Sequence, residues 1–203
     1  MLDFSAPFLA KGDKLICFGD SLTAQEGSYV GHLQSALPDN EIINAGRGGD
    51  KTTWALTRLE QDVLSQSPDA VLIMLGTNDA AVGRAVWADE PTIPPEAYLC
   101  NLKWIAHFCR LKGIQKISIA TPFGFEGSSF IEQGRIMEPY ALAAREAADQ
   151  MQARLVPLDA LFDKLRKGAP LSDMLVTRDG THPTPEIQKE IAQTMLKAWS
   201  MDI

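Results

Sequence analysis

Short apolar runs alternate with longer amphipathic segments along the whole chain. Five of the runs have the length and composition of β-strands: residues 14–18, 41–44, 70–75, 116–120 and 155–156. The run at 70–75 (AVLIML) is apolar at every position, which is typical of a strand in the middle of a parallel sheet that helices cover on both faces.

The segments between these runs carry apolar residues at helical spacing. They predict a helix at 29–37, which ends at Pro38, and an alanine-rich helix at 138–153. Three further helices are indicated by apolar stripes: Leu56, Leu59, Val63 and Leu64; Leu99, Leu102, Ala106 and Cys109; and Ile187, Ile191 and Met195, where Thr184 caps the helix and Pro185 begins it. The alternation predicts an α/β fold, a doubly wound parallel sheet in three layers, and we expect one domain over residues 1–203.

Two segments are longer than simple connections need to be, namely 80–95 and 121–137. Both follow predicted strands, so both lie at the carboxyl edge of the sheet. Open α/β sheets bind their ligands at this edge, which directs the search for functional residues to the loops that follow strands.

The composition is that of an ordinary globular protein, with 45% hydrophobic and 22% charged residues. A formal net charge of -7 makes nucleic acid a poor partner, because an acidic surface repels phosphate. No apolar run is long enough to span a bilayer, so we expect no stable membrane insertion. Residues 1–12 show no signal-peptide pattern, and the three cysteines form no CxxC pair, so we expect a reduced, cytoplasmic protein, with a secreted origin as the open alternative.

Ser21 stands directly after the first predicted strand, in the sequence GDSLT. A serine is a weak nucleophile until a base takes its proton. His182 is the candidate base, because the other histidines, His32 and His107, fall within predicted helices. Asp179 precedes His182 by one turn and can accept a hydrogen bond from its ring, which fixes the tautomer and favours the imidazolium.

Two further loops can supply hydrogen-bond donors to an oxyanion. Segment 44–50 (NAGRGGD) exposes backbone N–H groups, and it matches neither a Walker A nor a GxGxxG phosphate loop. Asn78, in GTND after the central strand, can donate from its carboxamide. Singly, each motif can equally be a turn, a helix cap or a flexible connection. Together, at one sheet edge, they supply the groups that acyl transfer requires.

In this order the motifs resemble those of the SGNH hydrolase superfamily, also called GDSL esterases. GDSLT, GRGGD, GTND and DGTH match its four blocks and span the chain from Gly19 to His182. The resemblance implies a five-stranded parallel sheet with flavodoxin-like winding and a shallow, exposed site. It also implies an oxyanion hole made of the Ser21 and Gly49 N–H groups and the Asn78 side chain. Many relatives have serine in place of Gly48, so we expect a more flexible loop there.

We therefore expect serine-dependent hydrolysis of carboxylic esters through an acyl-enzyme, with no cofactor and no metal. A thioesterase or a lysophospholipase of the same fold would use the same residues. A non-catalytic flavodoxin-like module is a third reading, although the acidic Asp20 stands where a phosphate-binding loop would lie. A metal-dependent hydrolase built on Asp20, Asp79 and Asp179 is a fourth, weakened by the single candidate histidine and the lack of HExxH.

Substrate contacts are assigned to Asp20, beside the nucleophile, and to aromatic residues in or next to the carboxyl-edge loops: Trp54, Trp87, Phe123 and Phe125. These aromatics can equally be packing residues. We expect a small-molecule or carbohydrate ester with a short acyl group. The acidic Asp89 and Glu90 interrupt the continuous apolar groove that a long acyl chain would need. No feature of the sequence indicates an oligomeric state.

Overall fold

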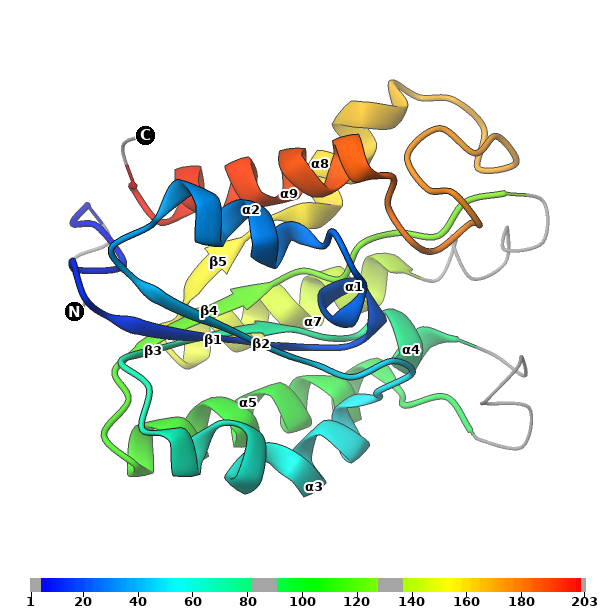
Figure 1. Cartoon of the computed structure of the whole chain (residues 1–203). Coiled ribbons are helices and arrows are strands. Elements are labelled where there is room, and N and C mark those ends of the chain that lie inside the picture. The colour runs from blue at the N-terminus through cyan, green and yellow to red at the C-terminus, as the bar shows by residue number, and fades with distance from the viewer. Residues whose placement is uncertain (1–4, 82–90, 128–136, 202–203) are drawn as a thin grey trace.

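The structure, a computed structural model, describes residues 5–81, 91–127 and 137–201 (Figure 1). Five strands form one sheet in the order β2-β1-β3-β4-β5, and all four pairings between them are parallel. Their bounds are β1 (Lys14–Gly19), β2 (Glu41–Gly46), β3 (Ala70–Met74), β4 (Lys116–Ala120) and β5 (Arg154–Val156). This is the flavodoxin-like order, whose switch point lies between β1 and β3.

Helices cover both faces of the sheet, as Figure 1 shows. One layer contains α3 (Thr52–Asp62), α5 (Pro95–Leu111) and α7 (Met137–Gln150). The other contains α2 (Tyr29–Ala36), α8 (Leu158–Arg166) and α9 (Pro185–Ala198). The predicted three-layer α/β fold with a five-stranded parallel sheet is confirmed.

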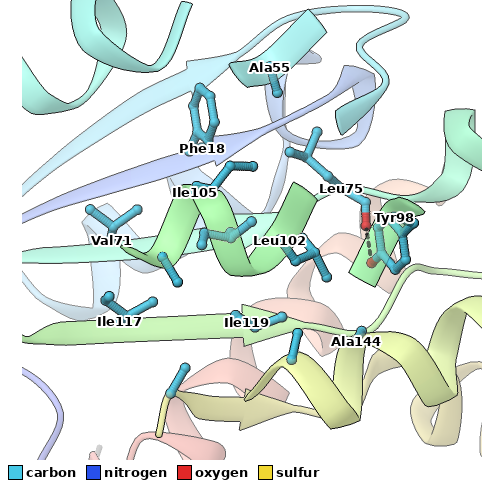
Figure 2. Close-up of a cluster of buried hydrophobic side chains, with 14 of the residues drawn as sticks. Phe18, Ala55, Val71, Leu75, Tyr98, Leu102, Ile105, Ile117, Ile119 and Ala144 are labelled. Carbon is cyan, nitrogen blue, oxygen red and sulfur yellow. Dashed lines mark hydrogen bonds between the residues drawn. The ribbon is translucent and has the colours of Figure 1, made fainter. Parts of the chain in front are cut away.

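β3 lies at the centre of both hydrophobic cores, and every one of its residues is buried. Val71 and Ile73 belong to the cluster beneath α3, α5 and α7, whereas Leu72 belongs to the cluster beneath α2, α8 and α9. This division follows the two-residue period of a strand. Figure 2 shows the first cluster, in which the Tyr98 hydroxyl donates to the Leu75 carbonyl at 2.9 Å.

Four short helical elements were not predicted from the apolar pattern. They are α1 (Ser21–Ala24), α4 (Thr77–Ala80), α8 and the 3-10 helix η1 (Leu64–Gln66). The turns α1 and α4 are too short to show a period. The predicted stripe through Leu64 was wrong in one respect, because α3 ends at Asp62 and Leu64 already belongs to η1. Among the residues described, no helix combines the length and the apolar character needed to cross a membrane.

Candidate active site

The carboxyl ends of β1, β2 and β3 bring three loops to one edge of the sheet. The strand register pairs Gly19, the last residue of β1, with Gly46 of β2 and Met74 of β3. The loops carrying Ser21, Gly49 and Asn78 therefore begin at the same level. A side chain at Gly19 would place its Cβ 2.7 Å from the Met74 carbonyl oxygen, so glycine permits this close approach.

Asp20 sets the turn that presents Ser21. Its Oδ1 accepts a hydrogen bond from the Leu22 N–H at 2.9 Å, which makes Asp20 the N-cap of α1. Burial raises the pKa of Asp20 to about 7 against the lowering effect of the Leu22 hydrogen bond, and the negative charges of Asp79 and Asp50 raise it further. The assignment of Asp20 to substrate binding is corrected, because its side chain is buried beneath the turn.

Ser21, His182 and Asp179 form one chain of hydrogen bonds. His182 Nε2 lies 2.9 Å from Ser21 Oγ, and His182 Nδ1 lies 2.8 Å from Asp179 Oδ2. Asp179 Oδ1 accepts the backbone N–H groups of His182 at 2.8 Å and Thr181 at 3.1 Å. Partial burial acts to raise the pKa of Asp179, but these hydrogen bonds outweigh it and lower the pKa. The ionised carboxylate favours a proton on Nδ1, which leaves the Nε2 lone pair for the Ser21 hydroxyl.

The predicted oxyanion donors lie on adjacent loops that are bonded to each other. Gly49 has φ +81°, a conformation that favours glycine. Asn78 is buried in α4, and its Nδ2 donates to the Asp50 carbonyl at 2.9 Å. Next to these two, the Asp79 carboxylate accepts the Thr52 N–H at 3.0 Å and also its hydroxyl. The Gly49 loop and α4 are thus fixed to one another.

Arg58, on the inner face of α3, supports the same loops and was missed in the sequence. Its Nε pairs with Asp50 Oδ2 at 2.5 Å, Nη1 donates to the Ala45 carbonyl at 2.9 Å, and Nη2 donates to the Gly19 carbonyl at 2.9 Å. The guanidinium also lies over the Phe18 ring, 4.3 Å from its centroid. The sequence did contain a signal for Arg58, because its helical spacing from Ala55 places a charged residue on the apolar, buried face of α3.

The aromatic residues assigned to substrate binding are placed differently from the prediction. Phe123 and Phe125 are buried in the two hydrophobic cores, so their assignment to substrate contact is corrected. Phe123 packs edge-on against Phe162 of α8, with ring centroids 5.1 Å apart. Trp54 is half-buried in the first turn of α3, directly after the Gly49 loop. Trp87 lies outside the described residues.

The three-aspartate metal site has no support in this arrangement. Asp20 and Asp79 are buried acceptors of hydrogen bonds, and Asp179 is bonded to His182. Within residues 5–81, 91–127 and 137–201, no three His, Cys, Asp or Glu side chains are grouped so that they could hold a metal ion.

The fold and the Ser-His-Asp arrangement define a serine hydrolase. Residues 17–189 match the model of the GDSL-like lipase/acylhydrolase family, and the chain belongs to that family. The chain is 27% identical to an acetylxylan esterase of Geobacillus stearothermophilus, over 93% of this chain and 94% of the relative. It is 30% identical to an arylesterase of Vibrio mimicus, over 89% and 85% of the two chains. The crystal structure of the acetyl xylan esterase AlAXEase is similar with a TM-score of 0.81 at 26% identity, covering 91% of this chain and 98% of that one.

These similarities confirm the SGNH resemblance seen in the four motifs, and with it the class of carboxylic ester hydrolases.

Proposed function

We propose that this protein hydrolyses short-chain carboxylic esters, first among them acetyl esters of carbohydrates, through an acyl-enzyme on Ser21. The observation that carries the proposal is the continuous hydrogen-bonded chain from Asp179 through His182 to Ser21, with distances of 2.8 and 2.9 Å. A hydroxyl in this arrangement has a base within reach of its proton, which an isolated surface serine lacks.

In the proposed reaction, Ser21 Oγ attacks the ester carbonyl carbon while His182 Nε2 accepts the hydroxyl proton. The carbonyl oxygen becomes an oxyanion, which the N–H groups of Ser21, Gly49 and Asn78 stabilise. The bond to the alcohol oxygen then breaks, and His182 donates its proton to that oxygen. Water attacks the acyl-serine by the same route and releases the carboxylic acid and free Ser21.

The preference for a short acyl group is supported by the loop that follows β4. Had the Phe123 and Phe125 side chains lined the site, they could have covered a long acyl tail. Both are instead packed in the cores, where they already bury their apolar surface. Each buried methylene of an acyl chain gains about 0.8 kcal/mol only where an apolar groove receives it.

A carbohydrate alcohol is supported by two observations. The relatives named above include two acetyl xylan esterases. Trp54 lies in the first turn of α3, shortly after the Gly49 loop, and is only half-buried. An amphipathic ring at the edge of a site can pack against the apolar face of a sugar while its N–H remains free to bond.

The proposal is tested by two measurements with Ser21→Ala as the control. Hydrolysis of p-nitrophenyl esters from acetyl to dodecanoyl should give the highest kcat/KM for acetyl to butyryl, and release of acetate from acetylated xylo-oligosaccharides should be visible by NMR. A steady rise in kcat/KM towards octanoyl and beyond would contradict the acyl preference. Faster hydrolysis of acetyl thioesters than of matched oxygen esters would instead indicate a thioesterase. Failure to release acetate from the oligosaccharide would contradict the proposed carbohydrate substrate.

A further inference from the structure

The Asp179–His182 pair lies in the segment that joins α8 to α9, outside the sheet. Within it, the Arg178 N–H donates to the His182 carbonyl at 2.9 Å, and the Thr184 N–H donates to the Val176 carbonyl at 3.1 Å. These bonds make a narrow turn over residues 176–184, called the catalytic turn below. They fix the shape of the turn, but they do not determine its distance from Ser21, which stands on another element.

The carboxylate of Glu126, from the segment after β4, holds the catalytic turn from its buried side. Oε1 accepts three hydrogen bonds, from the Val176 N–H at 2.8 Å, the Thr177 N–H at 2.6 Å and the Thr177 hydroxyl at 2.8 Å. Oε2 pairs with the guanidinium of Arg166. The Glu126 side chain is fully buried. One carboxylate therefore connects the segment after β4 to the first two residues of the catalytic turn.

The connection continues to the tip of the turn at Gly180, the residue after Asp179. The Thr177 hydroxyl oxygen accepts the Gly180 N–H at 3.0 Å, while the backbone N–H of Glu126 donates to the Gly180 carbonyl at 2.9 Å. The N–H and the carbonyl of Gly180 are thus both linked to Glu126, the first through the Thr177 hydroxyl and the second directly. Movement of Glu126 would be transmitted to Asp179.

Arg166, the last residue of α8, anchors the carboxylate in turn. Its guanidinium donates to the Asp173 carbonyl at 2.9 Å and the Ala169 carbonyl at 3.1 Å, and also to the Pro170 carbonyl. Burying an ion pair costs desolvation energy that an apolar pair of the same size would avoid. Such a pair is therefore a poor device for stability alone, and its directed hydrogen bonds indicate a role in placing the loop.

We propose that Glu126 is a positioning residue that holds Asp179 and His182 in register with Ser21. The inference rests on the function proposed above. Among the described residues, N–H or O–H groups face both oxygens of this carboxylate, from Arg166 at Oε2 and from Val176 and Thr177 at Oε1. In Glu126→Gln, either orientation of the amide directs its NH2 group at another donor. The substitution keeps the size of the side chain and removes an acceptor either from the catalytic turn or from Arg166, which anchors the carboxylate.

The experiment compares Glu126→Gln with wild type by kinetics and by NMR of the His182 ring. Misplacement of about 1 Å can cost a hundredfold in rate, so we expect kcat for p-nitrophenyl acetate to fall by at least roughly tenfold, with KM changed less than about twofold. The chain has three histidines, which makes ring signals assignable with His182→Ala. The Nδ1–H signal of His182, bonded to Asp179, should broaden or disappear in Glu126→Gln.

Ser118→Ala is the matched control for lost stability. It removes two buried hydrogen bonds, one donated to the Arg154 carbonyl and one accepted from the Trp199 ring N–H. Ser118 lies in β4 and has no hydrogen bond to the catalytic turn among those two. It should lower the midpoint of thermal unfolding and keep both kcat and the His182 signal. Thr177→Val is a milder second variant, because it removes the hydroxyl link to Gly180 while leaving the ion pair in place.

Wild-type kcat and an unchanged His182 signal in Glu126→Gln would overturn the proposal. The proposal would also be overturned if the two variants lost the same thermal stability and Glu126→Gln lost no more kcat than Ser118→Ala. If Glu126→Gln does not fold, Thr177→Val decides: a lower kcat at constant KM with a broadened signal supports the proposal, and wild-type values overturn it. The NMR readout needs no turnover. A protein that hydrolyses no ester would therefore contradict the proposed function, while the His182 signal in Glu126→Gln would still support or overturn the role of Glu126.

Discussion

Replacement of Asp179 by asparagine tests the link between the triad geometry and catalysis with the smallest change of shape. Asparagine fits the same space, but it can satisfy only part of the contacts that Asp179 makes. With its NH2 group towards His182, the ring must accept at Nδ1, so its proton moves to Nε2 and Ser21 loses its base. With the amide oxygen towards His182, the NH2 group faces the backbone N–H groups of Thr181 and His182.

The size of the effect follows from the exposure of the pair. For a buried triad, this substitution costs about 10⁴-fold in kcat. Here the Asp179 side chain is 48% exposed and that of His182 is 26% exposed, so water can solvate a rearranged turn. We therefore expect a smaller loss, about 10²- to 10³-fold in kcat, which corresponds to about 3–4 kcal/mol of transition-state stabilisation.

The assay is steady-state hydrolysis of p-nitrophenyl acetate above neutral pH. Asp173→Asn is the matched control, because it makes the same chemical change at an exposed position of the same loop. It should leave kcat near that of wild type. A kcat for Asp179→Asn within about threefold of wild type would refute the reasoning, since an effect of the wrong tautomer cannot be that small. An equal loss in Asp173→Asn would show that the loop, rather than the ring contact, was disturbed.

Three further results are expected. Asn78→Ala should lower kcat about a hundredfold with little change in KM, because one oxyanion donor is worth about 3 kcal/mol; an unchanged kcat would leave Asn78 only its bond to Asp50. The raised pKa of Asp20, about 7 against 3.8 in the unfolded chain, makes the folded protein hold more protons between these values, so its contribution to stability is lost as pH rises through this window. Asp20→Asn keeps an oxygen for the Leu22 cap and should make urea-unfolding free energies less dependent on pH from 4 to 7; the same pH dependence as wild type would contradict this. EDTA should leave activity unchanged, and a loss reversed by a divalent ion would indicate a metal.

The sequence was most informative where local pattern and fold class determine the outcome together. The apolar segment that became β3 could be recognised without any partner, because both of its faces are buried. Once the sheet is parallel, the loops after its strands must meet at one edge, and this alone brings Ser21 near Asn78.

Contacts between distant segments were beyond such reasoning. Glu126 meets Arg166 across 40 residues, and neither stands in a motif. Phe123 and Phe125 follow a strand at the ligand-binding edge, yet their side chains are buried in the cores. Gly124 between them packs against the Phe162 ring so closely that a Cβ at this position would lie 2.6 Å from the ring. Which aromatic residues face a ligand therefore depends on packing that no local pattern reports.

The central claim, that Ser21 is the nucleophile, is tested most directly by covalent labelling. A fluorophosphonate phosphonylates a serine that an adjacent base activates, and mass spectrometry of the digested protein locates the adduct. We predict one adduct on the peptide that contains Ser21 in wild type and none in Ser21→Ala. An adduct on a different serine, or ester hydrolysis by Ser21→Ala at the wild-type rate, would contradict the account.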